Sequence, residues 1–450
     1  MTQNNSSPNE PATGGGGMRA IFRRIGRNAG MLFGGRVAFG LLNLGSSILA
    51  VRAVGLEGFG VIILLQAYVR LISGLLKFQS WAAVTKFGAD ALQAGRNDDF
   101  RRLIGFTLRL DMLGLAISVG LAMLAAPYAA PWLGWTDAVA GFAIWFALTI
   151  PFITAATATG MLRLFDRFGV LVRQHALNAI VRFIGVVFIF FAGLGYEALI
   201  LAWAAGSVVS GTYIWYVALS EAHARKLSPR LWGRWSKLSK GFPNIWRFVV
   251  VMNLTSLMET ILMHATVLVV GGMLGPSAAG LFGVVKQLTE SLSRFSSLLG
   301  PVVFPEFAWL EAKGDRRAIS KLLWRMLLIS SGILGAFCLF LVFASEWVLL
   351  VFAKEAVVAA PLLVAMGVGS ALMALGFALE PAMLTIRKER ALLFSAVIST
   401  ILFCGMLFLF IEQFGLVGAG GAIAARQGMI FLHRIFIMWR VLVLRPRRVH

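Results

Sequence analysis

The sequence predicts an all-α polytopic membrane protein with twelve transmembrane helices, arranged as two six-helix lobes. Three observations predict this fold class. Hydrophobic residues make up 59% of the 450 residues and charged residues 14%, whereas a soluble domain is about half apolar and about a quarter charged. Apolar stretches of spanning length recur along the whole chain. A short glycine motif near residue 55 also returns 220 positions later in the same apolar surroundings.

Each candidate span is a mostly apolar stretch of about 20 residues, the length that crosses a bilayer as a helix. Six spans fall on each side of a polar stretch at 220–243. The twelve are 30–51, 58–79, 103–126, 138–161, 176–195, 198–219, 245–272, 278–300, 321–344, 356–380, 391–411 and 415–441. We therefore expect a disordered N-terminal tail at 1–17, an N-lobe at 18–219, a cytoplasmic linker at 220–243 and a C-lobe at 244–450.

The N-terminal tail is polar and has neither the apolar core nor the cleavage site of a secretory signal peptide. Met18 is an alternative start, so the sequence leaves open whether residues 1–17 belong to the protein. Cys338 and Cys404 both lie in apolar stretches without metal-ligand spacing, and we expect neither a metal nor a cofactor.

The net charge of +21 would suggest a nucleic-acid partner in a soluble protein. Here the basic residues concentrate in the N-terminal arm, in every second loop and at the C-terminus, which is the pattern of membrane orientation. We therefore expect no nucleic acid, a multi-pass protein of the cell inner membrane, and cytoplasmic termini. The basic segments are 19–27, 86–102, 163–173, 225–240, 313–321, 387–390 and 445–448.

Two glycine pairs mark the repeat. Gly55 and Gly60 lie between the first two spans, and Gly275 and Gly280 lie between the seventh and eighth. Glycine permits the positive φ of a tight reversal and lets backbones approach closely, so we assign all four to inter-helix reversals. Because six is an even number, both halves have the same orientation, and their pseudo-two-fold axis should run along the membrane normal.

Ionisable residues inside spans are costly and usually face a protein interior or a water-filled cavity. Polar side chains at helical spacing form one stripe on the second span and another on the eighth, which are equivalent in the repeat. The stripes are Gln66, Arg70, Ser73 and Lys77, and Lys286, Glu290 and Arg294. A stripe on each of two equivalent helices predicts a polar cavity between the lobes.

Cations outnumber acids in these spans, which predicts an anionic substrate, because guanidinium and ammonium groups bind phosphate oxygens. The alternatives are pairing with Glu290 and snorkelling to the interface, and we expect the latter of Lys77. Arg182 is a further cavity candidate. The residues assigned to diphosphate binding are Arg36, Arg70, Lys286, Arg294 and Arg426. Those assigned to ion coupling or charge balance are Glu259, His264 and Glu290.

Three motifs resemble those of polysaccharide flippases, the oligosaccharide-lipid branch of the MOP superfamily. They are Arg52-Ala53-Val54-Gly55 with Phe59-Gly60, then Leu274-Gly275-Pro276, and then Pro305-Glu306 followed by Ala312-Lys313-Gly314-Asp315. With the twelve spans, the resemblance covers about residues 20–440. The chain departs from the family pattern at Leu56, where proline is frequent, and at Ile62 and Phe282, where tyrosine is frequent.

The resemblance implies a flippase that moves undecaprenyl-diphosphate-linked oligosaccharide repeat units, for O-antigen, capsule or exopolysaccharide, from the cytoplasmic to the periplasmic leaflet. It implies alternating access of two six-helix lobes around a central, cation-lined cavity. We further expect the membrane potential to assist transport, and coupling to Na⁺ or H⁺ is an additional hypothesis. A polysaccharide polymerase and a chain-length regulator are the expected protein partners. The alternatives are a peptidoglycan-precursor (lipid II) flippase, a cation or drug antiporter of the same superfamily, and a membrane-embedded polysaccharide polymerase or ligase. No catalytic constellation occurs in the sequence, which disfavours the enzyme alternative.

Overall fold

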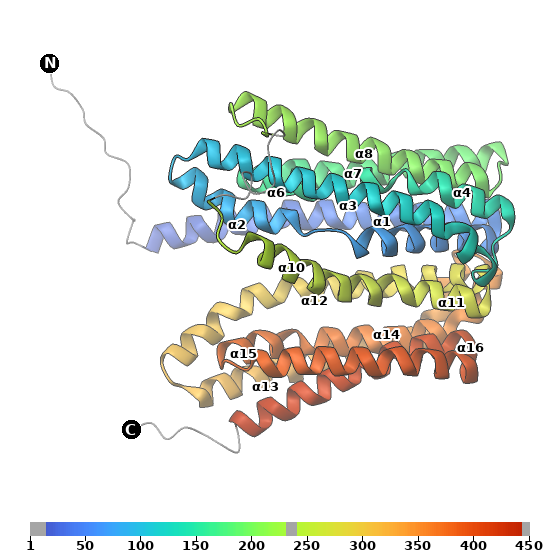
Figure 1. Cartoon of the computed structure of the whole chain (residues 1–450). Helices are drawn as coiled ribbons and strands as arrows, with labels where there is room; N and C mark the ends of the chain where they lie inside the picture. Colours follow the sequence, from blue (N-terminus) through green and yellow to red (C-terminus); the bar gives the residue numbers. More distant parts are fainter. Residues whose placement is uncertain (1–14, 231–240, 443–450) are drawn as a thin grey trace.

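The computed structural model describes residues 15–230 and 241–442, and within them all side chains except those of 15–38, 255, 259, 291–302, 305 and 442. The described residues form helices and connecting loops without a strand (Figure 1). The N-terminal half contains α1 (Gly15–Leu75), α2 (Ser80–Gln93), α3 (Asn97–Trp132), α4 (Asp137–Ala147), α5 (Ile150–Ile153), α6 (Ala156–Leu164), α7 (Phe168–Ala192) and α8 (Tyr196–Ala224). The C-terminal half contains α10 (Ile245–Thr260), the π-helical turn η1 (Ile261–Ala265), α11 (Thr266–Leu274), α12 (Pro276–Ala312), α13 (Arg316–Leu350), η2 (Lys354–Ala359), α14 (Ala360–Leu375), η3 (Gly376–Ala378), α15 (Leu379–Thr385) and α16 (Glu389–Leu442).

The all-α polytopic prediction is confirmed. In the part of the chain that the structure describes, eight helices are long and apolar enough to cross a membrane. There are nine if the bent pair Asp137–Ala147 and Ile150–Leu164 counts as one span. Each predicted span coincides with helix, and the first two and the last two are merged into α1 and α16. The total of twelve crossings stays a prediction. Helix α1 begins at Gly15, inside the stretch expected to be disordered, and residues 1–14 lie outside the described part.

Gly55 and Gly275 share one backbone conformation. Gly55 has φ 74° and ψ 177°, and Gly275 has φ 86° and ψ 174°. Side chains are essentially excluded from this region of φ and ψ, so only glycine adopts it without strain. The start of α1 and the following helix α2 lie at the same end of the molecule, so the chain turns back within α1 (Figure 1). The repeat therefore encodes the same sharp reversal twice.

Replacing Gly55 with alanine should strain the backbone without a steric clash, because an added Cβ would have no atom within 4 Å. We expect Gly55→Ala to cost about 1–3 kcal/mol of stability, seen as a lower melting temperature of the detergent-solubilised protein. Gly120→Ala is the matched control, since its Cβ also meets no atom within 4 Å and its φ is not positive. Equal melting temperatures for the two variants would contradict the assignment.

Gly60 and Gly280 are not at reversals, in contrast to the sequence assignment. Both lie inside helices, where α1 crosses α12. A Cβ on Gly60 would overlap the carbonyl oxygen of Pro276, and one on Gly280 would lie 3.1 Å from the backbone nitrogen of Gly60. These two glycines allow the closest contact between the halves, because backbone packs directly on backbone.

The two halves share a core at one end and separate toward the other. The largest apolar cluster joins residues of both halves, for example Phe59 and Leu64 of α1 with Phe282 and Val285 of α12. Toward the chain termini the clusters divide, and that around Phe307 contains only residues of the C-terminal half. The start of α1 and the end of α16 lie at this diverging end, which we call the terminal end; the opposite end is the far end (Figure 1).

Helix α10 belongs to the second half in sequence but starts on the first half in space. Phe242, Ile245 and Val249 are buried in one cluster with residues of α2 and α3. The ring of Phe248 lies 5.6 Å from that of Phe87 in α2, with an edge-to-face geometry. The π-helical turn η1 then connects α10 to α11, whose buried residues lie in the core shared by both halves. Whether residues 244–450 move as one lobe stays a prediction.

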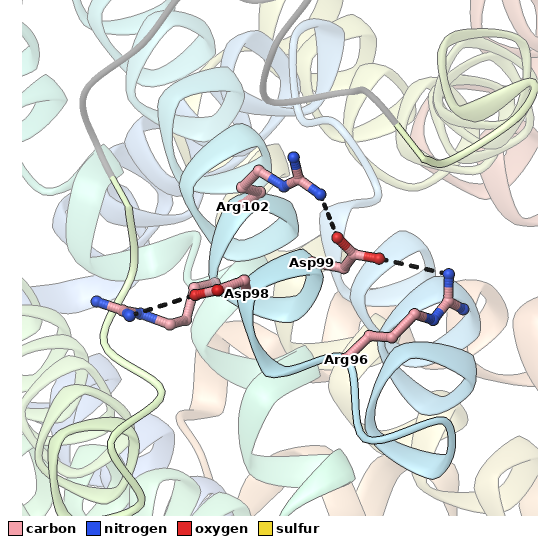
Figure 2. A network of polar contacts seen from close by, with 5 residues as sticks. Arg96, Asp98, Asp99 and Arg102 are labelled. Carbon is pink, nitrogen blue, oxygen red and sulfur yellow. Dashed lines mark hydrogen bonds and ion pairs between the residues drawn. The ribbon is translucent and has the colours of Figure 1, made fainter.

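The terminal end carries a network of acidic and basic side chains at the start of α3 (Figure 2). Asp99, in the first helical turn, pairs with Arg96 at 3.4 Å and also with Arg102. The Arg101 Nε donates to the carbonyl oxygen of Ser228, 3.1 Å away, which anchors the start of the polar linker on α3. The basic loop before α3 is therefore partly neutralised by acidic residues of the first turn of that helix.

Candidate functional site

The charged stripes of the second and eighth spans lie on α1 and α12, the two helices that cross between the halves. Arg70 of α1 is exposed, although protein surrounds it closely enough to desolvate it. Glu290 of α12 acts electrostatically on Arg70 across the two halves, so the stripes face each other.

Lys286 of α12 is held by two acceptors. Its Nζ donates to the carbonyl oxygen of Met263 over 2.6 Å and lies 3.8 Å from Oε1 of Glu290. Met263 is part of η1, and such a wide turn leaves carbonyl groups without their usual helical partners. The ammonium therefore fixes an irregular backbone segment and keeps a carboxylate neighbour, with about a fifth of its side chain exposed.

The same region contains His264, the next residue of η1. The charges of Arg70, Lys286 and Lys77 all act on His264, and Arg70 also acts on Arg182 and Lys77. Two acids belong to this group, Glu290 beside Arg70 and Lys286, and Asp111 beside Lys77. Because the cations of the group outnumber its acids, the region is electropositive, and guanidinium and ammonium groups supply donors for phosphate oxygens.

A hydrogen bond joins the halves beside these charges. Ser47 of α1 donates from Oγ to Oε1 of Gln287 in α12, 2.7 Å away, and Ser47 is buried. Gln287 follows Lys286 directly in sequence. Movement of the halves against each other must break this bond, so the polar stripe includes uncharged residues that hold the present arrangement.

The structure groups Arg426 differently from the other cation candidates. It lies on α16, and its charged neighbour is Arg434, which pairs with Glu380 at 3.2 Å. The Nε of Arg426 is buried without a hydrogen-bond partner. The structure thus brings together Arg70, Lys286, His264 and Glu290, but it does not bring Arg426 to them.

The side chains of three predicted site residues lie outside the described part of the structure. These are Arg36, Glu259 and Arg294. Their backbones lie in α1, α10 and α12, the helices that carry the described site. Their roles stay predictions.

The structure draws attention to two further residues as functional candidates. The guanidinium of Arg182 stacks on the ring of Trp203 at 4.1 Å, and its Nε lacks a hydrogen-bond partner. Asp111 of α3 is buried, and sequence reasoning did not assign it a role. The spacing of Asp111, Gly114 and Ser118, three small or polar residues on one helix face, was the available signal.

Solved structures of membrane transporters share this fold. A multidrug resistance MATE family transporter of the MOP superfamily, in an inward-facing conformation, matches with a TM-score of 0.70 at 16% identity, covering 89% of this chain and 94% of that one. The lipid II flippase MurJ in an inward closed conformation matches with a TM-score of 0.68 at 13% identity, covering 90% of this chain and 87% of that one. At 16% and 13% identity, these likenesses show that the chain shares the fold of these membrane transporters.

The family follows from the sequence match. The model of the polysaccharide biosynthesis protein family matches residues 25–311, well over half of the chain, and the protein belongs to that family. The inner membrane protein YghQ of Escherichia coli (strain K12) is 28% identical over 297 residues, which cover 66% of this chain and 83% of that protein. The protein is therefore a member of a polysaccharide biosynthesis family, and its described residues contain eight or nine candidate membrane spans.

Proposed function

We propose that the protein carries an undecaprenyl-diphosphate-linked oligosaccharide repeat unit from the cytoplasmic to the periplasmic leaflet. The observation that carries the proposal is a pair of cations on the two crossing helices, Arg70 of α1 and Lys286 of α12, with Lys286 Nζ 2.6 Å from the carbonyl oxygen of Met263 and 3.8 Å from Glu290. A diphosphate in a region of low dielectric requires such donors, since an unpaired buried charge is costly. Membership of the polysaccharide biosynthesis family supports the sugar part of the substrate.

The arrangement of the two halves supports a transport mechanism. The halves meet at the far end and separate at the terminal end, as expected for an inward-facing carrier whose termini are cytoplasmic. The diphosphate then displaces the contacts that Lys286 makes with Met263 and Glu290, and the halves rock about the reversals at Gly55 and Gly275. A membrane potential, negative inside, assists an outward-moving anion by about 2.3 kcal/mol per charge per 100 mV. We extend the proposal in two ways. Transport is coupled to Na⁺ or H⁺, and the protein docks with a polysaccharide polymerase and a chain-length regulator.

A reconstituted assay separates the candidate substrates. Purified protein in vesicles should translocate a fluorescent undecaprenyl-diphosphate oligosaccharide, measured as the fraction that an impermeant reagent cannot reach. A lipid II analogue and a cationic dye are the comparison substrates. Preference for lipid II would assign the protein to peptidoglycan-precursor transport, and transport of the dye alone would assign it to drug export. Either result overturns the proposal.

Lys286→Gln should lower transport of the oligosaccharide lipid by about tenfold, because one charged hydrogen-bond donor to the diphosphate is lost. Arg390→Gln is the control, since Arg390 is an exposed cation at the terminal end. An unchanged rate for Lys286→Gln would remove Lys286 from the substrate site.

A further inference from the structure

Among the side chains that the structure describes, Asp111 is the only charged one that is buried. It lies on α3, whose apolar sequence crosses the membrane region. An ionisable residue at such a position is costly and is a functional candidate by default. The substrate site described above does not use it, so its retention calls for a separate explanation.

Three hydrogen bonds hold the carboxylate. The hydroxyl of Ser80 in α2 donates to Oδ1 over 2.5 Å. The backbone N–H and the hydroxyl of Thr157 in α6 donate to Oδ2 over 3.0 Å and 2.6 Å. Asp111 therefore ties α2 and α6 to α3 from the centre of the N-terminal half. Ser80 lies on α2, and α10 packs on the same helix.

A polar cavity borders Asp111 on its remaining side. It encloses about 250 Å³ of empty space, open solvent included, and Lys77, Ser73, Ser118 and Thr154 line it with Asp111. The enclosed part of this space is about the size of one water molecule, so a sugar–lipid head group is excluded. The cavity fits water, a proton or a small ion.

Lys77 is the charged group that acts on Asp111, while α2 and α6 present the uncharged hydroxyls of Ser80 and Thr157. Arg70 also acts on Lys77, with the effect of a like charge. The carboxylate is thus the attractive partner of Lys77. The ammonium lies in the short segment 76–79 that connects α1 to α2.

The 76–79 segment makes the contact with α10. Gln79 donates from Nε2 to the hydroxyl of Ser256, and its Oε1 accepts from the indole N–H of Trp81 at 2.5 Å. Lys77 and Gln79 are two residues apart in this segment. Asp111 and Lys77 line one cavity, and the short 76–79 segment leads from there to the contact with α10.

We propose that Asp111 is a proton-binding site whose negative charge holds Lys77 and so keeps α10 docked on the N-terminal half. A proton that enters through the cavity binds to Oδ1, and the hydroxyl of Ser80 rotates to accept from the new O–H group. The ties to α2 and α6 survive, but the attraction for Lys77 is lost. The 76–79 segment is then released, and α10 can leave the N-terminal half as the halves rock.

The site suits a proton better than a metal ion. The backbone N–H of Thr157 and the ammonium of Lys77 offer hydrogens rather than lone pairs, and the ammonium repels a second cation. The inference concerns the junction of the halves and is independent of the transported lipid. It can therefore stand or fall separately from the proposed substrate.

Cross-linking tests the proposal without any substrate. The free cysteines Cys338 and Cys404 are first replaced by alanine, and Phe87→Cys with Phe248→Cys then reports on the docking of α10. We expect Asp111→Asn, which keeps the shape but not the charge, to slow cross-linking about fivefold or more. Acidification lowers the thiolate fraction in every variant, so rates are compared with Asp111→Asn at each pH, and the parent protein should slow more than Asp111→Asn does.

Two further variants make the result decisive. Lys77→Gln should match Asp111→Asn in rate and in loss of pH response, and it serves as the test if Asp111→Asn fails to fold. Ser80→Ala removes one hydrogen bond but keeps the charge, so it should retain the pH response. Parent-like cross-linking in both Asp111→Asn and Lys77→Gln overturns the proposal. A rate that changes with Na⁺ at fixed pH overturns the assignment to a proton.

Discussion

Arg70→Glu should abolish transport, with an initial rate at least about a hundredfold below that of the parent protein. The variant replaces a donor for the diphosphate with an acceptor beside Glu290, in an enclosed region. Removing one partner of a desolvated charge pair costs about 2–5 kcal/mol, and about 1.4 kcal/mol corresponds to a tenfold change. The measurement is the rate of lipid translocation in vesicles, normalised to the amount of folded protein.

A second variant separates substrate binding from structural pairing. If Arg70 serves only to balance Glu290, then exchanging the two charges in Arg70→Glu with Glu290→Arg should restore transport. We expect the exchange to restore the melting temperature without restoring the rate, because the diphosphate would meet a carboxylate on α1. Arg70→Lys should retain part of the activity, since it keeps the charge but loses the guanidinium fork. Full activity of the exchanged protein would remove Arg70 from the binding site.

Gly60→Ala should separate α1 from α12 and open the far end of the molecule. The new Cβ would overlap the carbonyl oxygen of Pro276, and a backbone atom cannot move aside as a flexible side chain would. Overpacking of this kind costs about 1–3 kcal/mol or more. The seal also includes Arg52, whose Nη2 donates to the carbonyl oxygen of Val351 over 2.7 Å.

The measurement for Gly60→Ala is cross-linking between Arg52→Cys and Val351→Cys, which should fall together with the melting temperature. Gly280→Ala should act in the same way. The double variant should lose less stability than the two single variants added together, because both changes open one contact. Gly40→Ala is the matched control in the same helix, since its Cβ would meet no atom within 4 Å. Undiminished cross-linking in Gly60→Ala would show that the halves are not sealed at this crossing.

Much of the fold could be predicted because its determinants are local or compositional. A run of about 20 apolar residues forms a helix in a bilayer whatever its neighbours are, since its backbone groups must be satisfied internally. Gly55 and Gly275 were predictable for a similar reason, because a positive φ is a property of one residue. The stripes on α1 and α12 followed from helical spacing, and the repeat indicated that they belong to equivalent helices.

The rest depends on distances between segments that the sequence does not contain. The same reasoning placed Gly60 and Gly280 at reversals, whereas their function is to bring two helices together, which only the partner helix reveals. Arg426 could be assigned to a span but not to a neighbour, and the structure gives it Arg434. The sequence predicted that Lys286 binds a phosphate or Glu290. Its hydrogen bond to a main-chain carbonyl group in η1 could not be predicted, because the spacing of side chains along the sequence does not indicate it.

The sequence by itself determined that this protein lives in a membrane, consists of two similar helical halves and carries an excess of positive charge inside its spans. Those properties are sums over the chain or rules of single residues. The tertiary structure alone decided which charges share a site, that α10 starts on the opposite half, and that Asp111 is buried beside Lys77. Burial and pairing arise only when helices far apart in sequence pack together, so they belong to the folded molecule.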